Sequence, residues 1–393
     1  MMNTEEKNEV LNPTVVKLGV VSFFADIASE MLYPITPIFL TTILGASVTS
    51  VGIIEGVAES IASLLKTYSG AWSDSLSKRK PFILIGYLLA ALSKPLIGAS
   101  TSWLGVLSAR ALDRTGKGIR SAPRDALLAE SVSPELRGAA FGWHRGMDTL
   151  GAAVGPLFAL YLLSTYADNL RPLFYWAVVP GLLAVLVIFL IKEPPHTESR
   201  KKIENPFKLW PQFDPAFKKY IFSWGLFSLT NSSDVFLLLK AKQTGQSMSA
   251  VIIMYCAYNL LYAISSPYLG KLSDVIGRKK LMLSGLLIFI LVYLGFGFAT
   301  EAWQLWVLFL LYGLYMGATE GVGKAFAIDL APKNLKATGV GILGTVTGLC
   351  TIVASTAAGF LWDHVGSSWT FFYGASGALL CACFLLFNAK RAS

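Results

Sequence analysis

The sequence contains little charge for its length. Of its 393 residues only 15% are charged, 54% are hydrophobic, and the mean hydropathy is +0.57. A soluble protein of this size needs more charged side chains to cover its surface, which argues against a soluble globular fold. A helix needs about 20 apolar residues to cross a bilayer, so twelve such helices would use roughly 240 residues. The remainder is enough only for short loops, one longer linker and two tails.

Cysteine and histidine are also scarce, with four and three residues respectively. All four cysteines lie in apolar runs, none has the paired spacing of a zinc site, and a disulfide within a membrane has little support. We interpret them as small buried hydrophobic side chains. The sequence also shows no nucleotide-binding loop, no metal-ligand cluster and no arrangement of a nucleophile. It therefore predicts neither an enzyme nor a cofactor or metal.

The charge that is present is unevenly distributed. The net charge is +9, and 25 of the 33 lysines and arginines lie in the tails, in the loops that we expect to face inward and at the adjoining ends of the spans. The loops expected to face outward contain three, namely Arg171, Lys240 and Lys242. This asymmetry follows the positive-inside rule and predicts that both termini are cytoplasmic. The lipid bilayer, and not a nucleic acid, is the partner that this charge pattern predicts.

One stretch occurs twice in the chain, at positions 70–80 and 270–280. The first copy reads GAWSDSLSKRK and the second GKLSDVIGRKK. Each copy leaves one apolar run, forms a short basic turn and enters the next apolar run. A repeat of about half the chain length within apolar sequence indicates two homologous membrane halves.

The apolar runs predict twelve membrane-spanning helices. Their expected ranges are 15–42, 50–72, 81–99, 102–125, 138–165, 172–192, 216–239, 248–270, 281–299, 302–330, 337–362 and 369–388. Residues 193–215 are rich in proline and basic residues and are the only stretch with the composition of a linker. We therefore expect an all-α membrane protein with two pseudo-symmetric six-helix halves, 1–192 and 216–393, joined by a cytoplasmic linker at 193–215.

Two motifs carry a resemblance to a known family. The repeated pattern, Gly-x-x-Ser-Asp followed by three basic residues, resembles the cytoplasmic loop signature of the major facilitator superfamily, between spans 2 and 3 and between spans 8 and 9. Residues 113–122, DRTGKGIRSA, resemble the arginine–glycine signature of that family in span 4. The resemblance covers the chain from the first span to the last. It implies a secondary transporter that works as a monomer, with Arg114 in proton or substrate handling.

A third motif bears on the direction of transport. Residues 151–156, GAAVGP, resemble the Gly-x-x-x-Gly-Pro signature of exporters in this superfamily, although Ala159 and Leu160 replace its terminal glycine pair. Close packing of a bent helix would require small residues and a proline as well. The motif therefore favours export without establishing it. The candidates for gating are Gly155 and Pro156 together with the loop residues Asp74, Arg79, Asp274 and Arg278.

Ionisable side chains are concentrated within the spans of the first half. Charges at membrane depth are unfavourable, so we expect them to face the protein interior or a water-filled cavity. Asp26 and Glu30 in span 1, and Glu55 and Glu59 in span 2, are each four residues apart and so share a helix face. With Arg114 they are the candidates for proton coupling. A permanent ion pair with the arginines of span 4 is the alternative for the first pair, and hydrated groups at the rim for the second.

Polar and aromatic side chains in both halves are candidates for substrate binding. The tyrosines among them are equally consistent with an aromatic belt at the membrane interface. The candidates are Tyr33, Lys94, Arg110, Arg145, Asp148, Asn231, Asp234, Tyr258, Asn259 and Glu320.

The sequence thus predicts a secondary active transporter of the bacterial cytoplasmic (inner) membrane that moves a small-molecule substrate by alternating access. Proton-coupled export is the function that it favours. The alternative is proton-coupled uptake of an organic anion or siderophore, with Lys94, Arg110, Arg114 and Arg145 as the anion site. A transport-inactive receptor or scaffold is a third possibility, against which the lack of a long structured loop argues. Lipid translocation also stays open.

Overall fold

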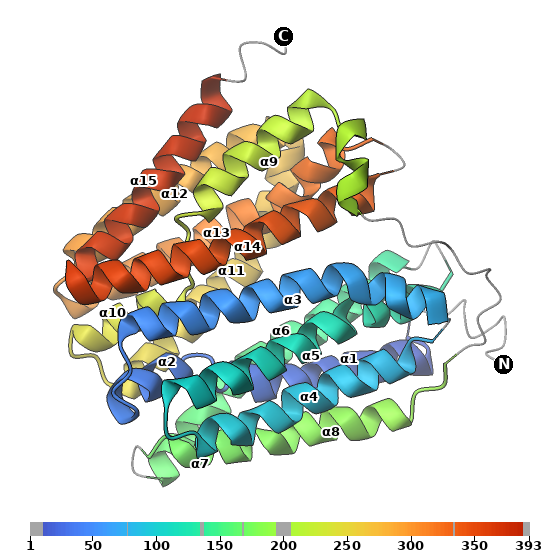
Figure 1. Ribbon diagram of the computed structural model, residues 1–393, viewed down its shortest axis with the longest axis horizontal. Coiled ribbons are helices and arrows are strands. Elements are labelled where there is room, and N and C mark those ends of the chain that lie inside the picture. Colours follow the sequence, from blue (N-terminus) through green and yellow to red (C-terminus); the bar gives the residue numbers. More distant parts are fainter. Residues whose placement is uncertain are drawn as a thin grey trace. The chain divides into compact units, whose positions relative to one another are not determined.

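The computed structural model describes residues 11–76, 78–133, 137–166, 169–193, 206–332 and 335–387. The regular structure within these ranges is helical, and nine of its helices are long and apolar enough to cross a membrane (Figure 1). The expected all-α membrane fold is therefore confirmed. Twelve spans remain a prediction, because three of the expected spans carry several charges or are interrupted.

The helices follow the expected spans closely in the N-terminal part of the chain. In order they are α1 (Pro13–Glu30), α2 (Thr36–Ile38), a π-helical turn (Phe39–Ile43), α3 (Val48–Leu76), α4 (Lys80–Ala99), α5 (Trp103–Glu130), α6 (Arg137–Thr165), α7 (Arg171–Trp176) and α8 (Val178–Phe189).

The C-terminal part continues in the same way. Its elements are a 3-10 helix (Pro206–Gln212), α9 (Pro215–Ser228), α10 (Val235–Gln243), α11 (Met248–Ile276), α12 (Arg278–Phe298), α13 (Ala302–Leu330), α14 (Lys336–His364) and α15 (Ser367–Phe387).

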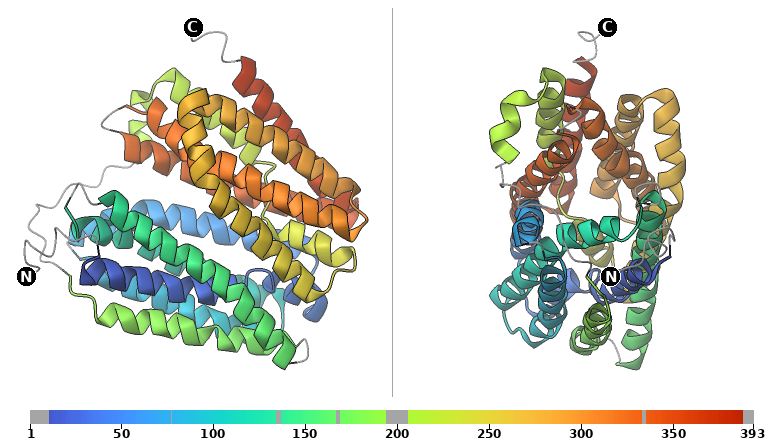
Figure 2. Two further views of the ribbon diagram at one scale, coloured as in Figure 1. Left: turned by 180° about the vertical axis from the view of Figure 1, so that it is seen from behind. Right: turned by 90° about the vertical axis from the view of Figure 1, so that its right-hand side faces the viewer.

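The chain divides into two compact units. The first comprises Met1–Leu40 and Ile61–Ile203, and the second comprises Thr41–Ser60 and Glu204–Ser393. The beginning of α3 therefore groups with the second unit, an exchange that the sequence did not predict. The boundaries expected at the linker remain predictions. Within each unit the long helices lie alongside one another (Figure 2).

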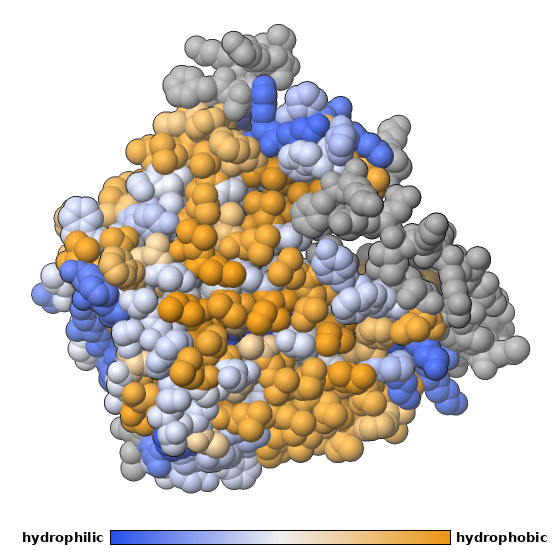
Figure 3. Space-filling view, viewed as in Figure 1, coloured by the Kyte–Doolittle hydropathy of each residue, from blue (hydrophilic) through white to orange (hydrophobic). Residues whose placement is uncertain are grey.

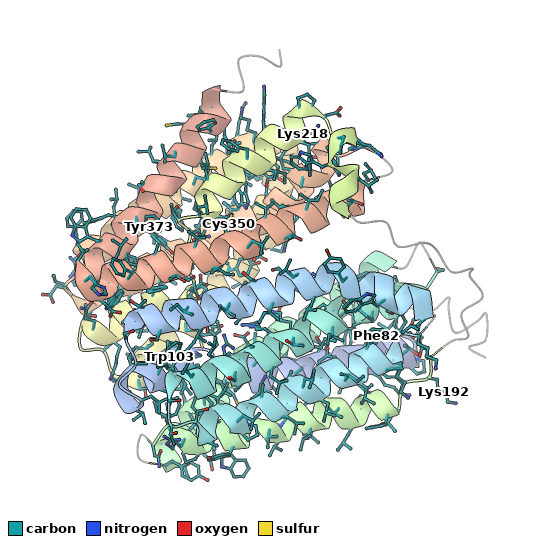
Figure 4. The ribbon with its side chains drawn as sticks, in the orientation of Figure 1. Phe82, Trp103, Lys192, Lys218, Cys350 and Tyr373 are labelled. Atoms are coloured by element: carbon teal, nitrogen blue, oxygen red, sulfur yellow. The ribbon has the colours of Figure 1, made fainter. Side chains whose placement is uncertain are left out.

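The first unit is held together by apolar packing and by hydrogen bonds at helix ends. Val15 and Leu18 of α1 share a buried core with residues of α4 and α8. At one end of the unit, Lys80 Nζ donates to the carbonyl oxygens of Phe189 and Ile191, at 3.0 and 2.8 Å, and so joins the start of α4 to the end of α8. Figure 4 shows Phe82 and Lys192 near this end, and Trp103 at the other end.

The second unit has an aromatic core. Phe289 and Tyr293 of α12 stack with ring centroids 3.8 Å apart, and Phe296 stacks on Phe371 of α15 at 5.4 Å. Aromatic pairs of this kind contribute about 0.5–1.5 kcal/mol each beyond the area that they bury. The core therefore fixes α12, α13 and α15 against one another and supports the polar residues beside it.

The outer sides of α4 and α8 are apolar. Leu88, Leu92 and Leu96 of α4, and Leu186 and Phe189 of α8, are exposed. Figure 3 shows hydrophobic side chains over much of this face of the two helices. Extended exposed apolar surface is typical of membrane or protein contact, and in a chain with spans of this length lipid is the natural partner.

The repeat is visible in matching structural details. Gly45 and Gly245 each have a positive φ, +62° and +81°, in the turns that precede α3 and α11. Both turns need a backbone conformation that residues with a Cβ atom rarely adopt. Spans 1 and 7, which correspond in the two halves, are both interrupted, at residues 31–35 and 229–234. Interrupted helices in corresponding positions are typical of substrate and ion sites in transporters.

Candidate functional site

The first unit contains a small polar cavity between α1, α4 and α5. Its volume is about 70 Å³. Asp26, Ser29, Glu30, Leu32, Tyr33, Thr36, Lys94, Ile97, Arg110, Asp113, Arg114, Lys117 and Arg120 line it. Five of these side chains are cationic and three are carboxyl groups. A cavity of this size holds a small ionic group, whereas a drug-sized molecule needs about 300–1,000 Å³.

Helices α4 and α5, which both contribute residues to the cavity, are in close backbone contact. A Cβ atom on Gly116 would lie 2.3 Å from the carbonyl oxygen of Gly86, and one on Gly86 would lie 2.6 Å from that of Gly116. Both positions therefore require glycine, because backbone atoms cannot move aside as a flexible side chain can. This approach brings Lys94 of α4 next to Asp113 of α5.

Asp113 is the centre of a buried ionic cluster. Its Oδ1 atom lies 2.5 Å from Lys94 Nζ and accepts a further hydrogen bond from Ser93 Oγ at 3.3 Å. Its Oδ2 atom lies 3.7 Å from Arg110 and 3.9 Å from Arg114. One carboxylate thus faces three cations, so the cluster keeps an excess of positive charge. Buried charges persist only when partners compensate them, so a cavity lined by five cationic and three carboxyl side chains is suited to an anion.

Arg120 adds a cation on the same side of α5. Its guanidinium carbon lies 3.9 Å from the centre of the Tyr87 ring, in a cation–π contact. The side chain is buried, and its Nε atom has no hydrogen-bond partner among the described residues. An unsatisfied buried donor is unfavourable by about 1–3 kcal/mol, which an anion in the cavity would recover.

Asp26 lies in the last full turn of α1 and lines the cavity. It forms no hydrogen bond or ion pair with any residue that the structure describes, and Arg110 and Arg114 contact Asp113 instead. Asp26 therefore forms no ion pair with the arginines of span 4 among the described residues, and its role stays a prediction. The charges that act on it are the carboxyl groups of Asp148 and Glu30 and the guanidinium groups of Arg120 and Arg124. A carboxyl group in this setting is suited to binding a proton.

The second unit holds a separate polar cluster around two carboxyl groups. Tyr312 Oη donates to Asp234 Oδ1 at 2.6 Å, and Tyr258 Oη donates to Asp234 Oδ2 at 3.0 Å. Glu320 accepts from Tyr262 Oη at 2.6 Å and pairs with Lys324 at 3.0 Å. These predicted tyrosine and carboxyl residues therefore contact one another directly.

The arginines of the repeated loops form equivalent ion pairs. Arg79 binds Glu130 at the end of α5 at 3.0 Å, and Arg278 binds Asp329 near the end of α13. Each partner lies 51 residues further along the chain. The side chains of the other two gating candidates in these loops, Asp74 and Asp274, lie outside what the structure describes.

The glycine motif of α6 has a packing role in the first unit. A Cβ atom on Gly151 would lie 2.5 Å from the carbonyl oxygen of Phe23, and one on Gly155 would lie 2.9 Å from that of Ile27. Both glycines thus allow α6 to contact the backbone of α1. Pro156 follows within the helix. This contact accounts for the small residues without reference to the direction of transport.

The cavity unites some predicted residues and leaves out others. Among its lining are Asp26, Glu30, Tyr33, Lys94, Arg110 and Arg114. Arg145 is not part of the lining, and its side chain is 69% exposed. Asp148 is also outside it and accepts a hydrogen bond from Ser22. Glu55 is buried and Glu59 half-buried on the part of α3 that groups with the second unit.

Two further candidates lie in the second unit. Asn259 donates to the carbonyl oxygen of Tyr255 at 3.0 Å, which is a bond within its own helix. Asn231 is half-buried at the interruption between α9 and α10. Neither observation identifies a ligand, so substrate binding by Asn231 and Asn259 stays a prediction.

The sequence did not single out Asp113, Lys117 or Arg120 as site residues. The signal for Asp113 was present: Lys94 stands alone in an apolar run and needs an anionic partner, and Asp113 follows in the next span. Arg120 belongs to the span 4 motif, in which only Arg114 was assigned a role. The structure puts its buried guanidinium at the cavity.

Long apolar helices around a buried, charged cavity define a membrane transport protein. A family model of the Major Facilitator Superfamily matches residues 18–239 and 220–393. The chain belongs to this superfamily, and it is accordingly a secondary transporter of small molecules in a membrane.

Three similar proteins illustrate the relationship. An uncharacterized MFS-type transporter of Methanocaldococcus jannaschii is 36% identical over 394 residues, which cover 98% of each chain. The multidrug resistance protein MdtG of Citrobacter koseri is 26% identical over 319 residues, 78% of this chain and 77% of that protein. The crystal structure of a mutant of the nucleoside transporter NupG superposes with a TM-score of 0.80 at 14% identity, covering 95% of this chain and 99% of that one.

Proposed function

We propose that this protein couples the movement of a small anion to the movement of protons in the same direction across the cytoplasmic membrane. The observation that carries the proposal is the excess of cationic side chains around the cavity of the first unit. In this scheme Arg110, Arg114, Lys117 and Arg120 attract the anionic group of the substrate. The volume of about 70 Å³ suits a carboxylate or phosphate group, with the rest of the substrate outside it.

The direction of coupling follows from charge. Protonation of Asp26 or Glu30 removes a negative charge beside the anion site. Two unit charges about 4 Å apart interact by about 4 kcal/mol at an effective dielectric constant of 20. A proton therefore strengthens the binding of an anion and weakens the binding of a cation. Because linkage is reciprocal, an anion and a proton bind together and cross together.

The route of the proton in this scheme begins at Asp26. Asp26 lines the cavity and has no ion-pair partner among the described residues, so its charge is not already neutralised. Proton binding at Asp26, with Glu30 one helical turn away, prepares the cavity for the anion. The carboxyl groups Glu55 and Glu59 lie outside the cavity lining and are not needed for this step.

Export of a cation by proton antiport is the second candidate. It is favoured by the similarity to the multidrug resistance protein MdtG, which is 26% identical over 78% of this chain. In that scheme the substrate and the proton compete for Asp26 and Glu30. Both schemes use alternating access by a monomer. In both, the two termini are cytoplasmic, a placement that the positive-inside pattern supports.

The test is uptake into proteoliposomes driven by an inward proton gradient, with a panel of organic anions, phosphorylated compounds and lipophilic cations. We expect an anion to accumulate in the wild type and not in Arg120→Gln, whereas Arg120→Lys retains part of the activity. Lys192→Gln, which removes an exposed lysine just after α8, is the control. Accumulation of cations alone, driven by an outwardly directed proton flux, would contradict the anion proposal and support export.

A further inference from the structure

The interruption of span 7 places one carboxyl group in an unusual position. Helix α9 ends at Ser228, α10 begins at Val235, and Asp234 lies at the junction. Its side chain does not cap α10 and instead points to two tyrosines. The corresponding span 1 is interrupted just after the candidate proton carriers Asp26 and Glu30. The two halves thus each place carboxyl groups at an interrupted helix.

Asp234 has hydrogen-bond donors but no counter-charge. Tyr312 Oη donates to Oδ1 at 2.6 Å and Tyr258 Oη to Oδ2 at 3.0 Å, and no basic side chain of the described residues forms an ion pair with it. A carboxylate in a membrane span without a cationic partner is unfavourable, and such groups are functional by default.

The groups around Asp234 are neutral or acidic. From α11 it faces Tyr258, from α13 Tyr312 and Tyr315, and from α12 Tyr293, whose ring stacks on Phe289. The carboxyl groups of Glu55 on α3 and Glu320 on α13 act on it through space. Glu320 differs from Asp234, because Lys324 compensates its charge at 3.0 Å. Asp234 is therefore the carboxyl group of this cluster that most needs a cation.

We propose that Asp234 is a second proton-binding residue, separate from the cavity of the first unit. A hydronium ion of the solvent transfers its proton to Oδ2, the oxygen with the longer hydrogen bond, and leaves as a water molecule. The new O–H group then donates to Tyr258 Oη, and the Tyr258 hydroxyl hydrogen turns away from Asp234. Tyr312 continues to donate to Oδ1, which becomes the carbonyl oxygen. No bond other than the O–H bond forms, and release reverses the step.

This step links the charge at the interruption to helix α11. Tyr258 is one helical turn before Tyr262, which binds Glu320 of α13 at 2.6 Å. A change in the hydrogen bond of Tyr258 therefore acts on the same face of α11 that contacts α13. The inference rests on the proposed proton coupling and adds a titrating group in the second unit.

Infrared pH-difference spectroscopy of the purified, substrate-free protein tests the proposal. A protonated carboxyl group has a C=O stretching band that is separate from the bands of the carboxylate and of the backbone. We expect acidification of the wild type to produce such a band, and Asp234→Asn to lose one component of it. Asp214→Asn, which alters an exposed aspartate of the same unit, is the matched control and retains the component that Asp234→Asn loses. A complete band in Asp234→Asn would overturn the proposal.

A tyrosine pair separates proton binding from a general loss of structure. In Tyr258→Phe the carboxyl group loses one hydrogen-bond partner, so its band should shift in frequency and titrate at a different pH. Tyr268→Phe removes a hydroxyl from an exposed residue of the same helix and should leave the band unchanged. Equal spectra for the two variants would overturn the assignment to Tyr258. A band that responds to sodium and not to pH would overturn proton binding.

The spectra are recorded without substrate and without transport, so they test proton binding by Asp234 independently of the proposed function. If uptake in proteoliposomes proves independent of protons while the Asp234 band titrates, the transport scheme fails and the proton-binding site remains. If uptake is proton-coupled and Asp234→Asn keeps the full band, the second site fails and the transport scheme remains.

Discussion

Substitution of Asp113 by Asn is the sharpest test of the ionic cluster in the first unit. Asp113 contacts Lys94, Arg110 and Arg114 and is the carboxylate that these three cations share. Asp113→Asn therefore raises the excess positive charge of this cluster from two to three. The side chains of Lys94 and Asp113 are only 5% and 11% exposed, so water cannot replace the lost partner. Removing one member of such a buried pair destabilises a protein by about 3–5 kcal/mol.

The second variant in this test removes both charges of the closest pair. Lys94→Met combined with Asp113→Asn returns the excess to two, so we expect it to recover at least half of the lost stability. Unfolding in a series of denaturing-detergent mixtures, followed by circular dichroism, gives the free-energy differences. The reasoning is refuted if Asp113→Asn is as stable as the wild type. It is also refuted if the double variant is no more stable than Asp113→Asn.

The remaining predictions concern the loops and the helix contacts. Arg79→Ala should lower the free energy of unfolding more than Arg278→Ala. The reason is that Arg79 is buried, whereas the ion pair of Arg278 is more exposed and such pairs contribute only about 0–1 kcal/mol. Equal losses of stability in thermal unfolding would contradict this. Gly116→Ala should destabilise the protein by about 1–3 kcal/mol, because its methyl group meets the backbone of α4. Gly146→Ala, where a methyl group meets nothing within 4 Å, should be neutral or stabilising, and the same measurement checks both.

Much of the fold follows from the sequence because apolar runs and charge placement report directly on membrane spans. The expected span 302–330 coincides with α13, and 248–270 lies within α11. The interruptions of spans 1 and 7 were not predicted. Signals for both breaks were present in the sequence, because Pro34 lies in the first break and the polar stretch 230–234, TNSSD, forms the second. The grouping of residues 41–60 with the second unit depends instead on tertiary contacts.

The candidate site was predictable only in part. Asp26, Glu30 and Arg110 were recognisable because ionisable residues in apolar runs are unfavourable unless they face a cavity. The role of Asp113 was not recognised. Its nearest partner is Lys94, 19 residues away, and the two side chains meet only when α4 packs against α5. Local sequence instead places Asp113 beside Arg114, which lies 3.9 Å away in the structure.

The ion pairs of the repeated loops show a similar limit. The sequence identified Arg79 and Arg278 as gating candidates from the repeat. It did not identify their partners, Glu130 and Asp329, since neither belongs to the repeated motif. The equal separation of 51 residues in both pairs could have served as a signal. This equal separation becomes noticeable only when one of the two ion pairs is already known.

The relative direction of proton and substrate movement tests the central claim most directly. The protein is reconstituted in liposomes that contain a pH-sensitive dye, with equal pH on both sides, and a substrate anion is added outside. We predict that the lumen becomes acidic as the anion enters, and that Asp26→Asn abolishes this signal while Asp214→Asn retains it. An alkaline shift, or acidification that persists unchanged in Asp26→Asn, would contradict the account.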